Sequence, residues 1–393
     1  MPSGLGRPPA EVDIDAGLVR RLLAAQFPHW AGLPVRAMPG AGWDNVIYRL
    51  GADLAVRLPR RLIGAEQVSK QHRWLPVLAG RLPLAIPVVA GQGVPGEGYP
   101  WRWSITSWLP GQIAGHCPGI DLLTAAARLA GFIAALRAVD LAGGPVSEFR
   151  RDLASRDRLV TGAIEALDDA PHRAAVIRAW RRALAAPAWD GPPVWMHGDL
   201  HPANLLATNG QLSGVLDFGL LGVGDPAVDL MVAWTFLSAP ARHAFRTALP
   251  ADDATWERGR GWALDLGLRC AAYSAGNPLL GKIGRYTISQ VLTELDAAAD
   301  AQPGATPHRN ASHPLANQRR QPTNALPLKL RHPRVACPAS DGMAQDTSCW
   351  SRRDRRAVAL GTYRASWAPV HFSSSVTSRR TSSQLGTGAG APS

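Results

Sequence analysis

The sequence predicts an α+β fold with two lobes, a small β-rich N-terminal lobe and a larger helical C-terminal lobe. Short strand-like segments are concentrated before residue 108, whereas helical periodicity dominates from Asp121 onward. Between them, Leu109-Pro110-Gly111 interrupts both patterns, and we interpret it as the hinge. The predicted parts are an N-terminal extension (1–14), an N-terminal lobe (15–107), a hinge (108–111), a C-terminal lobe (112–300) and a tail (301–393).

The N-terminal lobe is predicted to begin with a short helix and to continue as strands. Asp13 or Asp15 is expected to cap this helix, because apolar residues follow at helical spacing. These apolar residues are Leu18, Val19, Leu22, Leu23 and Phe27. A glycine-rich turn (MPGAGWDN) precedes the strands NVIYRL and DLAVRLP, which the Gly51-Ala52 turn joins. A helix over Ala65–Leu78 follows, and then the strands IPVV and RWSITSW.

The C-terminal lobe is predicted to be helical apart from one strand and one hairpin. Val194–Met196 is an apolar strand. The hairpin joins NLLA to LSGVLDF through Thr208-Asn209-Gly210-Gln211, in which Asn-Gly is a strong two-residue turn signal. Helices are expected over Asp121–Val139, Ser155–Leu167, Arg173–Leu184, Pro226–Leu237, Thr255–Ser274 and Pro278–Asp296.

The net charge of +12 is distributed unevenly along the chain. Residues 301–393 contain 13 Lys and Arg but only 3 Asp and no Glu, so the first 300 residues are close to neutral. A nucleic-acid-binding domain would carry its basic groups on a folded face beside aromatic residues, so we expect no nucleic-acid partner. The tail has no periodicity, which predicts disorder. It is either an accessory segment or the product of a shifted or extended reading frame.

The apolar pattern and the cysteines predict a cytoplasmic protein. No stretch approaches about 18 uninterrupted apolar residues, so no membrane span is expected. The first fifteen residues lack the apolar core of a signal peptide. The cysteines show no metal-ligand spacing and are too few for a disulfide framework. They are Cys117, Cys270, Cys337 and Cys349. The sequence leaves the oligomeric state open.

The segment from Val194 to Leu237 carries most of the chemical information. A carboxylate (Asp199), an amide five residues later (Asn204) and a second carboxylate (Asp217) stand at the ends of short apolar strands, within H-G-D-x-x-x-x-N and D-F-G. This order is typical of a phosphoryl-transfer site, in which one carboxylate accepts a hydroxyl proton and the other two groups hold Mg²⁺. Oxygen ligands suit Mg²⁺, and no third His or Cys lies nearby to favour zinc.

Several neighbouring polar residues are given structural roles. His197 and His201 are expected to orient the loop that carries Asp199. Asp225 and Asp229, in GDPAVDL, are interpreted as a helix N-cap and a first-turn acid. The alternative to a catalytic loop is a polar turn whose Asp and Asn satisfy only backbone groups. The three motifs together favour the catalytic interpretation.

These motifs resemble the aminoglycoside phosphotransferase family, which is related to choline kinases and more distantly to protein kinases. HGDLHPANLL, DFG and GDPAVDL resemble its catalytic loop, metal loop and following helix. GWDNVIYRL, LAVRLPRR, LPLAIPV and WLPGQ resemble its nucleotide lobe and hinge, and the similarity covers about residues 15–298. The resemblance implies a bilobal protein-kinase-like fold and an enzyme that transfers the γ-phosphate of ATP, with Mg²⁺, to a hydroxyl of a small molecule.

The resemblance also implies a role for each matching residue. Asp199 would be the general base, and Asn204 and Asp217 would be the Mg²⁺ ligands. A glycine-rich turn, a basic strand residue and the hinge would hold the phosphates and the adenine of ATP. These residues are Gly40, Gly42, Asn45, Arg57, Ser107 and Leu109.

Two residues depart from the pattern of the family. Arg57 stands where many relatives have a phosphate-binding lysine, and its guanidinium can hold phosphate oxygens in the same place. Gln71 stands on the facing helix where relatives usually have a glutamate, so it can hydrogen-bond Arg57 without neutralising it. Glu66 could take this role if the helix were rotated. A catalytically weak or inert nucleotide-binding pseudokinase is therefore the alternative to an active enzyme.

The sequence does not identify the acceptor. The resemblance implies an aminoglycoside-type antibiotic or a related metabolite. A polycationic aminoglycoside needs an acidic pocket, and the lobe as a whole is not strongly acidic, which weakens the aminoglycoside case relative to neutral hydroxyl compounds. Choline, homoserine and macrolides are alternative acceptors. The candidate pocket acids are Asp225, Asp252, Asp253, Glu257 and Asp265. Four aromatic residues could line a pocket but are mostly expected in the core, namely Trp234, Trp256, Trp262 and Tyr273.

Overall fold

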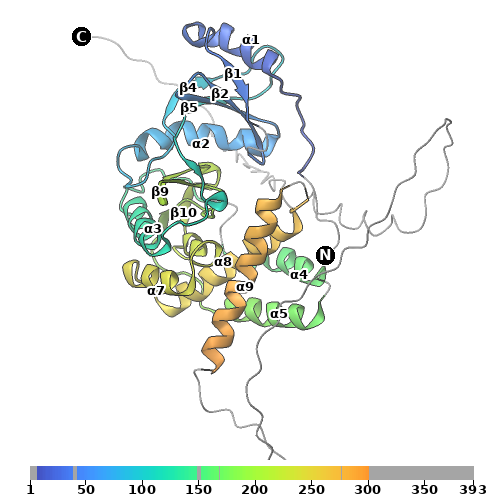
Figure 1. The fold of residues 1–393 in the computed structure, drawn as a ribbon, viewed down its shortest axis with the longest axis vertical. Coiled ribbons are helices and arrows are strands. Elements are labelled where there is room, and N and C mark those ends of the chain that lie inside the picture. The colour runs from blue at the N-terminus through green and yellow to red at the C-terminus, as the bar shows by residue number, and fades with distance from the viewer. Residues whose placement is uncertain (1–6, 39–41, 148–151, 168, 276, 301–393) are drawn as a thin grey trace, which may run out of the picture. The chain divides into compact units, whose positions relative to one another are not determined.

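The structure is a computed structural model that describes residues 7–38, 42–147, 152–167, 169–275 and 277–300. The predicted tail, residues 301–393, lies outside these residues. The first elements are α1 (Ala16–Gln26), β1 (Val35–Ala37), β2 (Asn45–Leu50), β3 (Leu54–Pro59), α2 (Leu62–Leu78), β4 (Val89–Gly93) and β5 (Trp103–Ser107). The strands form one antiparallel sheet in the order β1-β2-β3-β5-β4. Figure 1 shows the sheet between α1 and α2.

Alternation along β3 assigns its side chains to the two faces of the sheet. Val56 and Leu58 are fully buried and pack in one apolar cluster with the buried face of α1. Arg57, between them, reaches a side chain of α2 instead. The helix α1 begins where the sequence predicts, because Asp15 caps it by accepting the Leu18 N–H at 2.7 Å.

The C-terminal part is mainly helical, with three short strand pairs. Its helices are α3 (Leu122–Arg137), α4 (Asp157–Glu165), α5 (Ala170–Ala185), α6 (Val232–Thr235), α7 (Ala239–Ala248), α8 (Asp253–Ala272) and α9 (Pro278–Asp300). Two 3₁₀ turns, η5 (Phe218–Leu220) and η6 (Val228–Met231), matter for the site. The strands are β6 (Gln112–Ile113), β7 (Val194–Met196), β8 (Leu205–Thr208), β9 (Gln211–Val215) and β10 (Gly222–Gly224).

The short strands determine where the motifs lie. The β8–β9 hairpin has the predicted turn, with φ of 51° at Asn209 and 73° at Gly210, the positive values that an Asn-Gly hairpin turn requires. β6 adds to this hairpin, and β7 pairs with β10. The H-G-D segment therefore connects β7 to β8, and the D-F-G segment connects β9 to β10. Both loops lie at strand ends, as predicted.

A single large apolar cluster forms the core of the helical part. It includes the fully buried Phe132, Trp195, Trp234 and Trp262, and it extends to the last turns of α2. The core position expected for the tryptophans is confirmed. No helix among the described residues is long and apolar enough to cross a membrane.

Several predicted elements differ from the structure. Pro226–Leu237 is not one helix but η6 followed by the four-residue α6. The sequence analysis missed α7, although Ser238 at the N-cap position and Pro240 in the first turn are helix-start signals. In the predicted strand IPVV only Val89 belongs to β4, which continues through glycines and contains a bulge between Val89 and Gly91.

Candidate active site

The catalytic loop runs from β7 to β8, and its polar side chains bond to one another. Asn204 donates from Nδ2 to the backbone oxygen of Asp199 and to Asp199 Oδ2, both at 3.0 Å. The Asn204 N–H donates to His201 O at 2.8 Å. The structure therefore brings the predicted base beside one predicted metal ligand. Because Nδ2 faces Asp199, Oδ1 is the Asn204 atom that could bind a cation.

Asp229 anchors the start of this loop. Its carboxylate is fully buried and accepts the N–H groups of His197 at 2.8 Å and Gly198 at 2.9 Å. Gly198 has a φ of 85°, and a Cβ there would lie 2.6 Å from Leu220 O, so glycine is required. Asp229 does lie in the first turn of η6, as expected. The hydrogen bonds of its carboxylate to the catalytic loop, however, were not predicted.

His197 is buried, and both of its ring nitrogens are bonded. Nε2 donates to Leu216 O at 2.9 Å, and Nδ1 accepts the Asp199 N–H at 3.2 Å. This pattern requires a neutral ring with its hydrogen on Nε2. Burial lowers the pKa of His197, against the opposing effect of Asp229 and Asp199, and so favours that neutral ring. His197 thus has the orienting role that the sequence suggested.

His201 contacts the side chain of Asp199. Its Nε2 lies 3.4 Å from Asp199 Oδ2 and 3.2 Å from Asn204 Nδ2, and its Nδ1 accepts the Ala203 N–H at 3.3 Å. The ring is buried. His201 therefore packs against the base and the amide together, which is more than the loop-packing role of an isolated histidine.

The metal loop is joined to the catalytic loop through the Leu216 residue. Its N–H donates to Asn204 O at 2.8 Å, and its carbonyl accepts from His197 Nε2. The next residue, Asp217, has a left-handed backbone with φ of 59° and ψ of 73°. Asn204 and Asp217 together offer an amide oxygen and a carboxylate, a donor set that fits Mg²⁺. Among the described residues no group of three or more His, Cys, Asp or Glu could hold a metal ion.

Arg57 connects the sheet to the metal loop. Its Nη2 lies 3.2 Å from Asp217 Oδ1, and its Nη1 donates to Gln71 Oε1 at 3.2 Å. The predicted register of α2 is therefore right, because Gln71 is buried against Arg57 whereas Glu66 is exposed. Gln67, one turn before Gln71 on α2, contacts the metal loop at Gly219. A Cβ added to Gly219 would lie 2.2 Å from Gln67 Oε1.

Replacing Gln71 with glutamate is expected to raise turnover several-fold. A carboxylate at this position would neutralise Arg57 and weaken the competing pull of the guanidinium on Asp217. Initial rates of Mg²⁺-dependent nucleoside diphosphate release would measure the change. Glu66→Ala is the matched control on the exposed face of the same helix. An inactive Glu66→Ala variant with an unchanged Gln71→Glu variant would show that Glu66 is the functional partner.

The predicted phosphate-covering turn is described from Gly42 onward, and Gly40 lies outside the described residues. Gly42 has a φ of 77°, which agrees with a tight turn. Asn45 is buried at the start of β2. The ring of Trp43 meets that of Tyr273, at the end of α8, edge to face with centroids 5.4 Å apart. The turn thus contacts the helical part of the chain.

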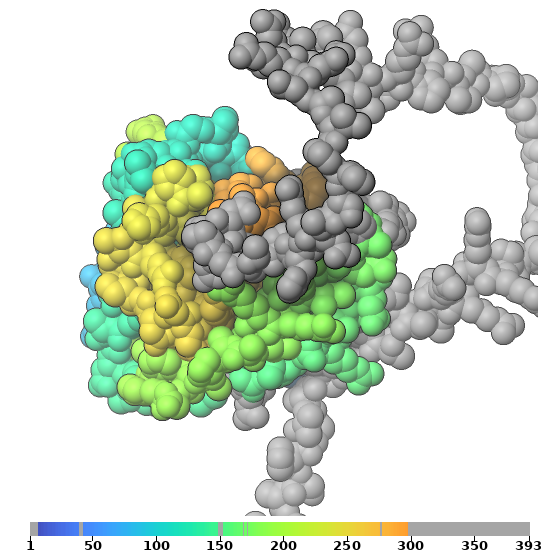
Figure 2. Space-filling model, turned by 90° about the horizontal axis from the view of Figure 1, so that it is seen from below, coloured from blue at the N-terminus to red at the C-terminus, as the bar shows by residue number. Residues whose placement is uncertain are grey.

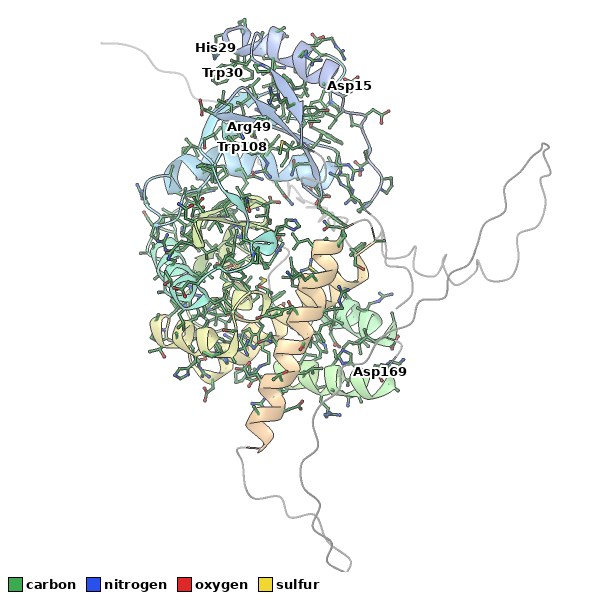
Figure 3. All side chains as sticks on the ribbon, viewed as in Figure 1. Asp15, His29, Trp30, Arg49, Trp108 and Asp169 are labelled. Atoms are coloured by element: carbon green, nitrogen blue, oxygen red, sulfur yellow. The ribbon has the colours of Figure 1, made fainter. Side chains whose placement is uncertain are left out.

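Two backbone N–H groups at the start of the hinge are hydrogen-bonded within the N-terminal lobe. The Ser107 N–H donates to Val88 O at 2.8 Å, and the Trp108 N–H donates to Asp53 O at 2.7 Å. Arg49 lies over the Trp108 ring, 4.1 Å from its centroid, and Figure 3 shows the two side chains together. These two N–H groups are therefore engaged, so the backbone of Ser107 could offer a base its carbonyl but not its N–H. A base-binding N–H would have to come from Leu109.

The acids proposed for a polycation pocket already have partners within the protein. Asp225 forms a buried pair with Arg258 at 2.8 Å, and Asp252 caps α8 by accepting the Thr255 N–H at 2.6 Å. Asp265, which is 1% exposed, is shared by Arg156 at 3.2 Å and Arg269 at 3.1 Å. Asp253 pairs with Arg246, and Glu257 pairs with both Arg182 and Arg260. Each of the five acids is therefore already bonded to an arginine or to a helix start.

Asp253 and Glu257 line a cavity of about 520 Å³ between α5, α7, α8 and α9. Figure 2 shows this end of the molecule, with α5 in green and α7 in yellow. None of the predicted catalytic, metal or nucleotide residues lines it. Its arginines and acids pair with one another, and Glu294 also accepts from the ring N–H groups of Trp234 and Trp256. This cluster stabilises the helix packing.

The site and the fold define a class of protein, the small-molecule kinases. The model of the phosphotransferase enzyme family (APH) matches residues 38–262, more than half of the chain. The chain therefore belongs to this family. A comparison with curated proteins finds no match.

Solved structures show the same fold. The GDP complex of wild-type aminoglycoside 2'-phosphotransferase-IIIa is similar at a TM-score of 0.58 and 19% identity, over 72% of this chain and 100% of that chain. The GDP and kanamycin complex of APH(2")-IIia is similar at a TM-score of 0.55 and 21% identity, over 72% of this chain and 98% of that chain. The bilobal protein-kinase-like fold predicted from the sequence is thereby confirmed.

Proposed function

We propose that this protein is a Mg²⁺-dependent O-phosphotransferase that moves the γ-phosphate of ATP to a hydroxyl of a small molecule. The observation that carries the proposal is the hydrogen-bonded assembly of Asp199, Asn204 and the Leu216–Asp217 segment at adjoining strand ends, with Arg57 reaching it from the sheet. This is the set of groups that phosphoryl transfer needs for proton acceptance, metal binding and charge neutralisation. The GDP in the two similar structures makes GTP a necessary comparison.

In the proposed reaction the Asp199 carboxylate accepts the hydroxyl proton as the acceptor oxygen bonds to the γ-phosphorus. The bond from that phosphorus to the bridging oxygen breaks, and nucleoside diphosphate leaves. His197 Nδ1 accepts the Asp199 N–H, Asp229 holds the backbone of His197 and Gly198 before it, and Asn204 donates to Asp199 Oδ2. Asn204 Oδ1 and Asp217 would hold Mg²⁺, which neutralises phosphate charge when it is bound. Arg57 would contact the phosphates once a cation replaces it at Asp217.

Replacing Asp217 with alanine is expected to weaken Mg²⁺-dependent nucleotide binding by at least about 100-fold, equivalent to roughly 2.7 kcal/mol. The change removes the only carboxylate of the proposed metal pair. Equilibrium titration of a fluorescent nucleotide with and without Mg²⁺ would measure it. Asp217→Asn is the matched variant, because it preserves the shape of the loop but lacks the charge. Binding by Asp217→Ala that equals wild type would contradict the metal assignment.

The pairing of the candidate pocket acids favours an uncharged acceptor over a polycation. The five acids that an ammonium-rich compound would use are bound to arginines or to a helix cap. Arg156 and Arg269 share the single carboxylate of Asp265. An acceptor with several ammonium groups would have to break these pairs, whereas a neutral hydroxyl compound would not. We therefore rank neutral hydroxyl compounds, macrolides included, above aminoglycosides.

The deciding experiment is nucleoside diphosphate release by the full-length protein with ATP or GTP. The acceptor panel contains aminoglycosides, macrolides, choline and homoserine. Release stimulated by one compound and lost in Asp199→Ala would establish the reaction and the acceptor class together. Gln71 motivates the second candidate, an inert nucleotide-binding protein. Nucleotide binding without release for any acceptor, in wild type and in Gln71→Glu alike, would favour that candidate.

A further inference from the structure

The carbonyl groups of residues 43–45, where the turn enters β2, accept hydrogen bonds from the Arg7 side chain and the Arg60 backbone. Arg7 donates from Nε to Trp43 O at 3.1 Å and from Nη2 to Asn45 O at 2.9 Å. Between these two, Asp44 O accepts the backbone N–H of Arg60 at 2.9 Å. Three successive carbonyls therefore bond to donors that belong to residues outside the turn.

The segment that carries Arg7 is itself fastened to the sheet and to α2. Arg60 Nη1 donates to Pro8 O at 2.7 Å, and the Glu11 N–H donates to Arg60 O at 2.9 Å. Glu11 Oε2 accepts the Leu62 N–H, at the first residue of α2, at 2.9 Å. Figure 1 shows this segment, in dark blue, running beside the sheet from α1. The backbone that follows the exposed Arg7 is thus fixed at Pro8 and Glu11.

The opposite sides of the turn are packed as well. A Cβ on Gly64, in the first turn of α2, would lie 2.9 Å from Asp44 O, so α2 approaches the turn as closely as a glycine allows. Asp44 also pairs with Arg61 at 3.0 Å, and Trp43 meets Tyr273. Residues 43–45 are therefore fixed between the N-terminal segment, α2 and the end of α8.

The orientation of these carbonyls matters for an anion. In a planar trans peptide the C=O and the following N–H point in opposite directions, so a donor that fixes the carbonyl also fixes the N–H. Carbonyl oxygens repel phosphate, whereas successive backbone N–H groups attract it. Holding the carbonyl of Trp43 against Arg7 turns the following N–H, that of Asp44, away from Arg7.

We propose that Arg7 is a positioning residue for the nucleotide phosphates, which orients the turn at residues 43–45 from its outer side. This inference rests on the proposed function, because it requires that the turn cover phosphates. Arg7 acts through the backbone, and its two bonds are charge-assisted, the stronger class of hydrogen bond. No other described side chain donates to two carbonyls of this turn.

The test compares full-length Arg7→Ala and Arg7→Lys with Arg36→Ala, which removes an exposed arginine from β1 of the same sheet. Titration of a fluorescent nucleoside diphosphate with Mg²⁺ is expected to show about tenfold weaker binding for Arg7→Ala. Lysine, with one ammonium for two carbonyls, is expected to restore part of the affinity. Hydrogen exchange at the amides of residues 43–46 is expected to be faster in Arg7→Ala than in Arg36→Ala.

Each outcome decides the matter. Unchanged nucleotide affinity in Arg7→Ala would overturn the proposal. An equal loss of affinity in Arg36→Ala would also overturn it, because the general loss of a positive charge would then explain both results. If Arg7→Ala does not fold, Arg7→Lys becomes the test. Wild-type nucleotide affinity in Arg7→Lys, together with faster exchange at the amides of residues 43–46, would then overturn the proposal. If the wild-type protein binds no nucleotide, the proposed function fails. The exchange comparison would still show whether Arg7 holds the turn.

Discussion

Replacing Asp199 with alanine is expected to lower the acceptor-stimulated rate about 10³-fold while nucleotide binding stays near wild type. The carboxylate is the group proposed to accept the hydroxyl proton, and three contacts within the loop position Asp199. Its side chain faces Asn204 Nδ2 and His201 Nε2, and its N–H donates to His197 Nδ1. The nucleotide and its metal would instead contact Arg57 and Asp217. Steady-state rates and a separate nucleotide titration distinguish the two effects.

The control for this prediction is Asp199→Asn. The amide oxygen can still accept the hydrogen bond from Asn204 Nδ2, so the loop geometry is kept, but the amide does not take up a proton. We expect it to be as inactive as the alanine variant and closer to wild type in thermal stability. Substantial turnover in Asp199→Asn would show that Asp199 orients the hydroxyl rather than accepting its proton.

Replacing Asp229 with alanine is expected to destabilise the fold by about 2–6 kcal/mol, because two buried N–H groups lose their acceptor at roughly 1–3 kcal/mol each. Those groups belong to His197 and Gly198, at the entrance of the catalytic loop. The buried Arg137 guanidinium also loses the favourable charge of Asp229. Chemical denaturation followed by circular dichroism would measure the lost stability, and the activity of the folded fraction would report the misplaced loop.

Two variants test the cause of this effect. Asp229→Asn keeps one acceptor oxygen, so its loss of stability should lie between wild type and Asp229→Ala. Asp253→Ala removes an aspartate whose side chain is 96% exposed and paired only with Arg246, so little change is expected. If Asp229→Ala were as stable as Asp253→Ala, the loop would have another anchor.

Local sequence patterns predicted which of the candidate residues lie close together. Asp199, Asn204 and Asp217 lie within one strand–loop–hairpin unit, so their spacing along the chain fixes their neighbourhood in space. The contact between Arg57 and Gln71 was also expected, because the resemblance to the family places Gln71 on the helix where relatives carry the partner of the basic strand residue. The functional roles of these residues remain predictions.

The contacts that the sequence analysis missed join residues far apart in the chain. Asp229 reaches the catalytic loop across 32 residues, and Asp265 pairs with Arg156 across 109. Arg7 reaches the turn before β2 across 36 residues. Their sequence surroundings resemble ordinary helix starts and surface charges, so only the packing of the chain reveals the partners. The mutual pairing of acids and arginines, which adds support for an uncharged acceptor, was not predicted for the same reason.

The Leu216 peptide connection has a consequence for how the two substrates affect each other. The N–H of Leu216 donates to Asn204 O, and the carbonyl of Leu216 accepts from His197 Nε2. The next residue is Asp217. A cation that moved Asp217 would therefore strain bonds that align Asp199, and an acceptor that moved Asp199 would be felt at Asp217. Thermodynamic linkage makes such an influence equal in both directions. Cooperation between acceptor and nucleotide can thus arise in this enzyme from one residue, without any movement of one lobe relative to the other.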